Sequence, residues 1–189
     1  MTTVKPRAKG LTGFMTAIGA CAIAWSDEGV VGVQLPEADE AQTLARLGRR
    51  FPTAAPHRPS PAVLEAIDRI TALLRGEPDD LLTIKLDFGP AANLDRRVWE
   101  IARGIAPGRT RAYGEIAAEL GDPALAREVG GALGRNPAPI IVPCHRVLAA
   151  GGKIGGFSAH GGVTTKRRML AIESALADGD PDLFRPLRL

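Results

Sequence analysis

Apolar and polar positions predict different elements in the two halves of the chain. Residues 14–25 and 30–35 are largely apolar, so we expect two strands joined by a turn. Residues 37–50 have helical composition, and residues 60–76 repeat apolar positions at helical spacing after a Ser-Pro start. Alternation over 82–88 predicts a further strand. The first half is therefore predicted to be a small α/β unit.

The second half has the pattern of short amphipathic helices. We expect one helix over 94–105 and two more over 113–120 and 124–133, the last two separated by a tight turn. Two helices joined in this way have helix-turn-helix form, in which the second helix contacts DNA. Helical hairpins are also common in proteins that never bind DNA. A final helix is expected to be capped by Thr164 or Thr165.

These patterns divide the chain into four segments. We expect a flexible leader over 1–12, an N-terminal α/β domain over 13–89, a mainly helical domain over 94–177 and a tail over 178–189. The residues between the two domains have the glycine and proline content of a linker.

Composition and charge narrow the class of protein. A hydrophobic fraction of 45% and a charged fraction of 24% are ordinary for a globular protein, and no apolar run approaches a membrane span. Two cysteines, Cys21 and Cys144, cannot form a disulfide framework, which favours a cytoplasmic protein without membrane contact. Residues 94–173 carry 12 Lys/Arg against 7 Asp/Glu. That excess is compatible with nucleic acid, and a solvated basic face is the alternative.

The candidate chemistry lies in the segment Ile-Ile-Val-Pro-Cys-His-Arg-Val at 140–147. A free thiol with a pKa of ~8.5 is only slightly ionised at neutral pH. His145 and Arg146 are of the types that raise the thiolate fraction or accept its proton. The alternative is a buried structural cysteine, because free cysteine usually behaves as a small hydrophobe. Cys21 lacks neighbours at metal-ligand spacing, so we expect no metal site.

Glycine-rich stretches flank this segment on both sides. Gly130 and Gly131 inside a helix cost about 2 kcal/mol relative to alanines, a cost tolerated where a backbone approaches another group. Three glycine pairs over 151–162 surround Phe157 and Ser158. We interpret this stretch as the wall of a ligand pocket, with a loose surface loop as the alternative. It does not match a nucleotide-binding fingerprint.

Several motifs together resemble the O6-alkylguanine-DNA alkyltransferases, also called methylated-DNA–protein-cysteine methyltransferases. They are Tyr113, the run Arg-Glu-Val-Gly-Gly-Ala at 127–132, Asn136-Pro137, Pro-Cys-His-Arg-Val at 143–147, and Glu173. The resemblance is strong over 94–173, whereas the first half resembles the family's variable N-terminal domain only in element order. It implies an N-terminal α/β domain with a ribonuclease-H-like sheet and a mainly helical C-terminal domain with a helix-turn-helix.

The resemblance also implies a role for each catalytic residue. Cys144 would accept the alkyl group, and His145 would take the thiol proton through a water. Glu173 would orient His145, and Asn136 would tie the turn to the active-site loop. The reaction it implies is single-turnover, irreversible transfer from O6-alkylguanine, with O4-alkylthymine as a further substrate, without metal or other cofactor.

DNA contacts are implied as well. Arg127 would enter the minor groove in place of the flipped base, and Tyr113 would press on the phosphate backbone. Ala126 and Gly130 would belong to the same DNA-binding surface. The implied partner is double-stranded DNA containing O6-alkylguanine, bound by a monomer. The implied substrate pocket consists of Tyr113, Leu133, Pro139, Val147, Phe157 and Ser158.

Three alternatives and three departures qualify this hypothesis. Non-catalytic alkyltransferase-like proteins bind lesions but replace the acceptor cysteine, which is present here. A thiol hydrolase or peroxidase would turn over, and a repair protein that also regulates transcription would need an extra zinc-cysteine domain. The chain has Leu94-Asp95 where the family usually has Phe-Gln, Phe157 where many have tyrosine, and Ala159-His160 where Gly-Gly is more usual. These departures concern alkyl-group preference.

Overall fold

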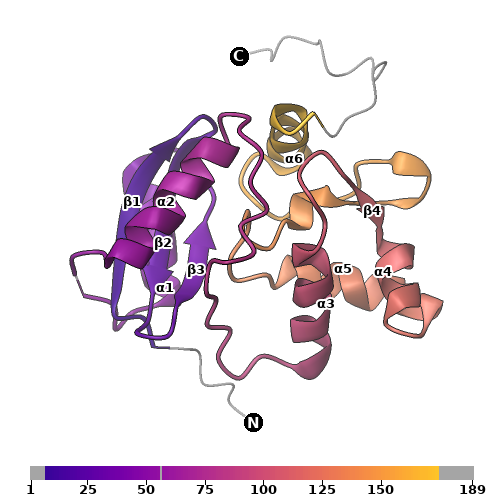
Figure 1. The fold of residues 1–189 in the computed structure, drawn as a ribbon, viewed down its shortest axis with the longest axis horizontal. Coiled ribbons are helices and arrows are strands. Elements are labelled where there is room, and N and C mark those ends of the chain that lie inside the picture. The colour runs from indigo at the N-terminus through magenta and orange to yellow at the C-terminus, as the bar shows by residue number, and fades with distance from the viewer. Residues whose placement is uncertain (1–6, 56, 175–189) are drawn as a thin grey trace.

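The computed structural model describes residues 7–55 and 57–174, and they form two packed halves (Figure 1). The N-terminal half has a three-stranded antiparallel sheet of β1 (Gly10–Thr16), β2 (Gly19–Trp25) and β3 (Val30–Gln34), in that order. In the register, Phe14 lies opposite Cys21, and Ile23 lies opposite Val33. The central strand β2 is therefore hydrogen-bonded on both edges.

Helices cover both faces of this sheet (Figure 1). Helix α1 (Glu40–Arg50) begins at the Asp39 cap and packs Leu47 against Ala22 and Ala24 of β2. Helix α2 (Pro61–Leu73) begins at a Ser60 cap with proline in its first turn, and it packs on the opposite face. Successive side chains of β2 point to opposite faces of the sheet. Both sets are apolar, since a helix covers each face.

The C-terminal half is mainly helical. It contains α3 (Asn93–Arg103), α4 (Tyr113–Glu119), α5 (Ala126–Gly134) and α6 (Gly162–Ile172), with the short parallel strands β4 (Arg111–Ala112) and β5 (Val147–Leu148). Single 3-10 turns lie at Pro123–Leu125, Cys144–Arg146 and Ala150–Gly152. The core of this half gathers the apolar faces of α3, α4 and α5 around Trp99, whose indole N–H donates to the Ala132 carbonyl at 2.8 Å.

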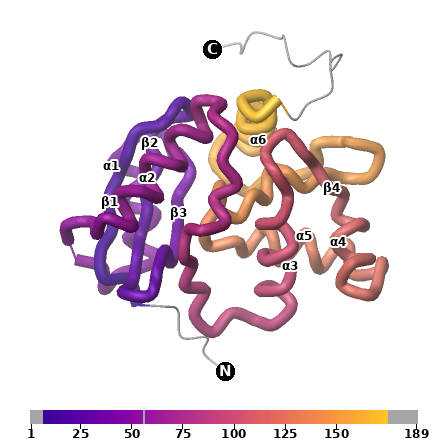
Figure 2. The backbone as a smooth tube through the Cα atoms, viewed as in Figure 1, coloured from indigo at the N-terminus to yellow at the C-terminus, as the bar shows by residue number. Residues whose placement is uncertain are grey.

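Segments distant in sequence connect the two halves. The Pro137 carbonyl accepts from the Val33 N–H at 2.9 Å and from Arg50 Nη2 at 2.8 Å. Ile140 and Ile141 lie in the same core as β2 and α2. The chain between α2 and α3 runs between the halves (Figure 2). The Leu86 side chain of this segment packs against both cores. The coarse division into a sheet with helices and a helical half agrees with the prediction; the ribonuclease-H-like topology and the domain limits stay predictions.

Three predicted elements in the first half are wrong in detail. The leader was expected to reach residue 12, but β1 starts at Gly10 because the Lys9 N–H already pairs with the Trp25 carbonyl. Residues 14–25 are not one strand: they span the end of β1, a turn and β2, with Gly19 at φ 125°. The stretch 82–88 makes only a single parallel bridge, Leu86 to Val30, at the first residue of β3; farther along this strand, the Val33 N–H donates to the Pro137 carbonyl instead. Residues 1–6 and 178–189 lie outside the described residues.

Two predictions in the second half also need correction. The helix expected over 124–133 begins at Ala126 and follows a 3-10 turn. Thr164 and Thr165 do not cap α6, because the chain enters it through Gly161 in the left-handed region; Thr165 Oγ1 instead donates to the His160 carbonyl at 2.7 Å. Among the described residues, no helix is long and apolar enough to cross a membrane.

Candidate active site

Cys144 lies at the start of a 3-10 turn that follows a loop closed by hydrogen bonds. Asn136 closes this loop, since its Oδ1 accepts from the Ala138 N–H at 2.9 Å and its Nδ2 donates to the Val142 carbonyl at 2.8 Å. Ile140, inside the loop, has φ 77°, a left-handed conformation that a β-branched residue rarely adopts. The loop therefore holds an unfavourable backbone in place next to the thiol.

The surroundings of the Cys144 thiol favour its protonated form. Burial raises its pKa, while a hydrogen bond with Asn136 and the positive charge of Lys166 act in the opposite direction. Burial and the proximity of Cys144 raise the pKa of the Tyr113 phenol. Nucleophilic attack by this thiol accordingly requires a nearby group that accepts its proton.

His145 and Glu173 form a buried pair beside the thiol. Glu173 follows the last residue of α6, and its Oε1 lies 3.0 Å from His145 Nε2. Burial opposes ionisation of Glu173, but hydrogen bonds from His145 and Arg146 lower its pKa to about 2. An ionised carboxylate only accepts, so we assign the imidazole proton to Nε2, which leaves Nδ1 as an acceptor. Nδ1 is buried and has no partner within the described part of the chain.

Arg146 completes the charge balance of this cluster. It donates to Glu173 through Nε at 2.8 Å and Nη2 at 2.9 Å, and through Nη1 to the Ile105 carbonyl at 2.5 Å. Burial lowers the pKa of His145, so the imidazole is neutral at pH 7. Glu173 thus pairs with a permanent cation and orients a neutral imidazole that can receive a proton.

Lys166 is a buried cation that was not predicted from the sequence. Its Nζ donates to the Val147 carbonyl at 2.6 Å and lies 5.9 Å from the Tyr113 ring centroid and 6.0 Å from that of Phe157. Burial lowers its pKa to about 8. A lysine in an amphipathic helix is normally predicted to lie at the surface. The only indication in the sequence that Lys166 is buried was its position on the same helical face as Met169 and Leu170.

A cavity of about 360 Å³ opens onto the thiol. It is lined by Tyr113, Gly130, Leu133, Gly134, Cys144, Gly156, Phe157 and Ser158. Of the predicted pocket residues, Pro139 lines a neighbouring cavity instead. Val147 lines neither of these two cavities, because β5 buries its side chain in the core of the helical half.

Three of the four predicted DNA-binding residues lie along α5, and the fourth, Tyr113, begins α4. Arg127 is exposed in the first turn, and no hydrogen bond or ion pair of its side chain is present in the described part of the chain. Gly130 faces the Tyr113 ring across the cavity wall: a Cβ there would lie 3.8 Å from Tyr113 Cε1, an ordinary van der Waals contact. Ala126 is half-buried against the core. In the described residues, no group of three or more His, Cys, Asp or Glu is arranged to hold a metal ion.

Comparisons with known proteins point to one family of DNA-repair proteins. Residues 93–175 match the family described as 6-O-methylguanine DNA methyltransferase, DNA binding domain. The methylated-DNA–protein-cysteine methyltransferase of Mycobacterium tuberculosis is 43% identical over 119 residues, which cover 63% of this chain and 70% of that protein. The protein with the same description from Methanothermobacter thermautotrophicus is 33% identical over 157 residues, covering 83% of this chain and 81% of that one.

A solved structure extends the likeness to nearly the whole chain. The crystal structure of Mycobacterium tuberculosis OGT in complex with DNA superposes with a TM-score of 0.69 at 31% identity. The match covers 93% of this chain and 99% of that one. Both halves, and not only the helical one, therefore share the architecture of that protein.

Proposed function

Because this chain belongs to the O6-alkylguanine-DNA alkyltransferase family, we propose that it repairs alkylated DNA by moving the alkyl group to its own Cys144. The function is direct-reversal DNA repair, and DNA is its partner. The observation that carries the assignment to Cys144 is its position at the cavity beside the buried His145–Glu173 pair. A non-catalytic lesion-binding protein of the alkyltransferase-like kind replaces the acceptor cysteine, which is present here.

The chemistry follows from the protonation states of the site. His145 Nδ1, reached through a water, takes the thiol proton, and Glu173 stabilises the imidazolium that forms. The thiolate attacks the alkyl carbon of O6-alkylguanine, forming the C–S bond as the C–O6 bond breaks. The electron pair of that bond goes to the guanine, which takes up a proton. Water does not cleave the C–S bond of the thioether, because a thiolate is a poor leaving group. Each molecule therefore reacts once.

Access to the O6 position requires the nucleotide to leave the base stack. In our proposal α5 approaches the minor groove, and Arg127 fills the space vacated by the base. Tyr113, whose ring lies between the cavity and Lys166, guides the phosphate backbone, and the Ser158 N–H donates to O6. Binding as a monomer and a cytoplasmic location stay predictions.

Mass measurement tests the assignment directly. The protein is incubated with a duplex containing O6-methylguanine and digested, and the peptides are weighed. We expect the mass of one CH₂ on the Cys144 peptide, in an amount equal to the protein that reacted. The Cys21 peptide is an internal control, because burial raises the pKa of that thiol to about 12. Modification of Cys21, or product in excess of protein, would overturn the proposal.

A further inference from the structure

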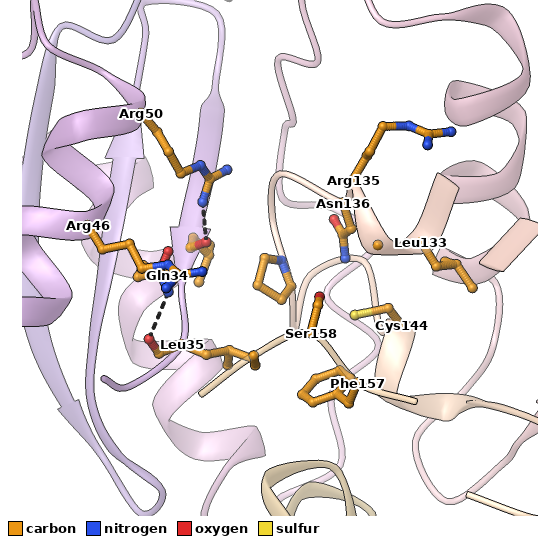
Figure 3. Close-up of a pocket in the computed structure, with 14 residues that line it drawn as sticks. Gln34, Leu35, Arg46, Arg50, Leu133, Arg135, Asn136, Cys144, Phe157 and Ser158 are labelled. Carbon is orange, nitrogen blue, oxygen red and sulfur yellow. Dashed lines mark hydrogen bonds between the residues drawn. The ribbon is translucent and has the colours of Figure 1, made fainter. Parts of the chain in front are cut away.

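Cys144 lies where two cavities meet. The cavity of about 360 Å³ described above carries Tyr113 and Gly130 on its walls. A second cavity of about 230 Å³ extends from the thiol toward the N-terminal half (Figure 3). The two share Leu133, Gly134, Cys144, Phe157 and Ser158. A group bound at the sulfur can therefore extend in either direction.

The far wall of the second cavity belongs to the N-terminal half. Strand β3 contributes Gln34, and α1 contributes Arg46 and Arg50. Figure 3 shows Arg46 and Arg50 on one side of the cavity and Cys144 on the other. Of the lining residues of this cavity, three are arginines and none is acidic.

The charges on this wall are unequally compensated. Arg135 is paired with Asp95 at 2.7 Å, and Arg46 lies 3.3 Å from Glu37. Arg50 donates to the carbonyls of Val33 and Pro137, which carry no charge to neutralise it. Burial and the neighbouring Arg46 lower the pKa of Arg50, which indicates that its charge is unfavourable where it lies. An anion bound in this cavity would stabilise the positive charge of Arg50.

The proposed reaction supplies a group that needs such a space. When an O6-alkyl group larger than methyl is transferred, the C–O6 bond breaks and the C–S bond forms at the same carbon, and the rest of the alkyl chain stays on that carbon. In the proposed reaction the base occupies the first cavity, so the rest of the alkyl chain requires room elsewhere beside the sulfur. The second cavity is that room.

We propose that the second cavity is an alkyl-chain site that favours O6-alkyl groups ending in a carboxylate over neutral groups of the same size. The site rests on the proposed function. Arg50 contributes a positive charge that no carboxylate neutralises, but two carbonyls hold its guanidinium in place. Arg46 is the residue that can reach the carboxylate, because about half of its side chain is exposed, although its Nε also lies 3.3 Å from Glu37. A carboxylate and a guanidinium form charge-assisted hydrogen bonds that an uncharged amide cannot match.

The test compares three duplexes that differ only in the O6 group: carboxymethyl, its neutral isostere carbamoylmethyl, and methyl. Single-turnover rate constants are measured for the full-length protein and for Arg46→Gln. Since Arg46 is partly exposed, we expect the carboxymethyl-to-carbamoylmethyl ratio to fall about three- to tenfold in Arg46→Gln.

Arg49→Gln is the matched control. It removes the same charge from the same helix, but Arg49 does not line the cavity, so the ratio should equal that of the unaltered protein. An unaltered ratio in Arg46→Gln overturns the inference, as does an equal loss on all three duplexes, which would assign Arg46 to general DNA attraction. Failure of the unaltered protein to accept methyl would overturn the proposed function instead.

Discussion

Nε2 of His145 lies 3.0 Å from Oε1 of Glu173, and both side chains are buried. The two residues belong to different elements, since His145 lies in the turn that carries Cys144 and Glu173 follows the last residue of α6. The carboxylate also accepts two hydrogen bonds from Arg146. Glu173 is therefore shared between a base and a permanent cation, and its removal affects both chemistry and stability.

Glu173→Gln should lose both stability and transfer. Leaving a buried charge without its partner costs about 3–5 kcal/mol, because Arg146 would stay charged in the interior. For a protein of this size that loss lowers the melting temperature by roughly 10 °C. Thermal unfolding and single-turnover transfer of methyl measure the two effects. Glu100→Gln, on the exposed face of α3, is the control and should change neither. A Glu173→Gln protein with normal transfer would refute the role given to His145.

Acid should destabilise the protein in two steps. Burial lowers the pKa of His145 below its usual 6.5, so the unfolded chain takes up this proton first and stability falls as the pH drops through about 6.5. The pKa of Glu173 is about 2 when folded, against 4.5 ordinarily, so its contribution is present above 4.5 and disappears as the pH falls toward 2. Denaturant unfolding over this range measures both. In Glu173→Gln the second step should be reduced; an identical profile would contradict the assignment.

Cys144→Ala should abolish transfer and keep DNA binding. The cavity and α5 do not depend on the sulfur, so duplex affinity in a titration should stay within about twofold of the unaltered protein, a difference of well under 1 kcal/mol. Cys21→Ala is the control, because that thiol lies in the core of the sheet and should not affect transfer. If Cys144→Ala fails to bind DNA, recognition and chemistry are not separate as we propose.

Arg127→Ala should impair the reaction on duplex more than on the free base O6-benzylguanine. An arginine that contacts a base contributes about 1–3 kcal/mol, and a free base needs no flipping. Rate constants for the two substrates give the comparison, with Arg58→Ala as a charge-matched control in an exposed loop of the other half. Equal losses on both substrates would contradict a role in base flipping.

Lys166→Met should slow transfer while changing the free energy of unfolding by less than about 2 kcal/mol. The substitution leaves the Val147 carbonyl without its donor, but it also removes a buried charge, and these effects oppose each other. The thiolate loses its nearby cation, and the Tyr113 and Phe157 rings lose the ammonium they share. Lys153→Met, an exposed lysine, is the control for transfer and denaturant unfolding. Equal transfer in both variants would show that Lys166 has no part in the site.

The sequence predicted the reactive residues better than their surroundings. Cys144, His145 and Glu173 were expected together because motifs carry them, and the structure brings them together. Lys166 could not be predicted, because periodicity assigns a residue to a face of a helix and does not reveal that a lysine there extends under two rings. Arg46 and Arg50 belong to the N-terminal half, and the sequence around them does not indicate that they lie near Cys144.

The difference between local pattern and three-dimensional surroundings also explains the errors in the predicted elements. Alternation over 82–88 is a local property, whereas a strand also needs a free edge to pair with; beyond the Val30–Leu86 bridge, the Val33 N–H of β3 pairs with the Pro137 carbonyl. Threonine before a helical pattern predicts a cap, but the left-handed backbone of Gly161 starts α6 earlier. In both cases the outcome depends on neighbouring chain that composition does not describe.

The single carbonyl of Pro137, which accepts from both Val33 and Arg50, also bears on how such a protein can change over time. What the N-terminal half must supply at this joint is one strand N–H and one guanidinium, whereas Ile140 and Ile141 require only an apolar surface of matching shape. Further hydrogen bonds to that half run from Arg103 to the carbonyls of Leu81, Leu82 and Ile84 and from Arg168 to the carbonyl of Ala17, so they too are made to backbone. Many side chains of that half can then change in sequence while the acceptor segment beside it stays in position. Swapping this half between relatives should succeed wherever all of these contacts are kept, and fail where they are lost.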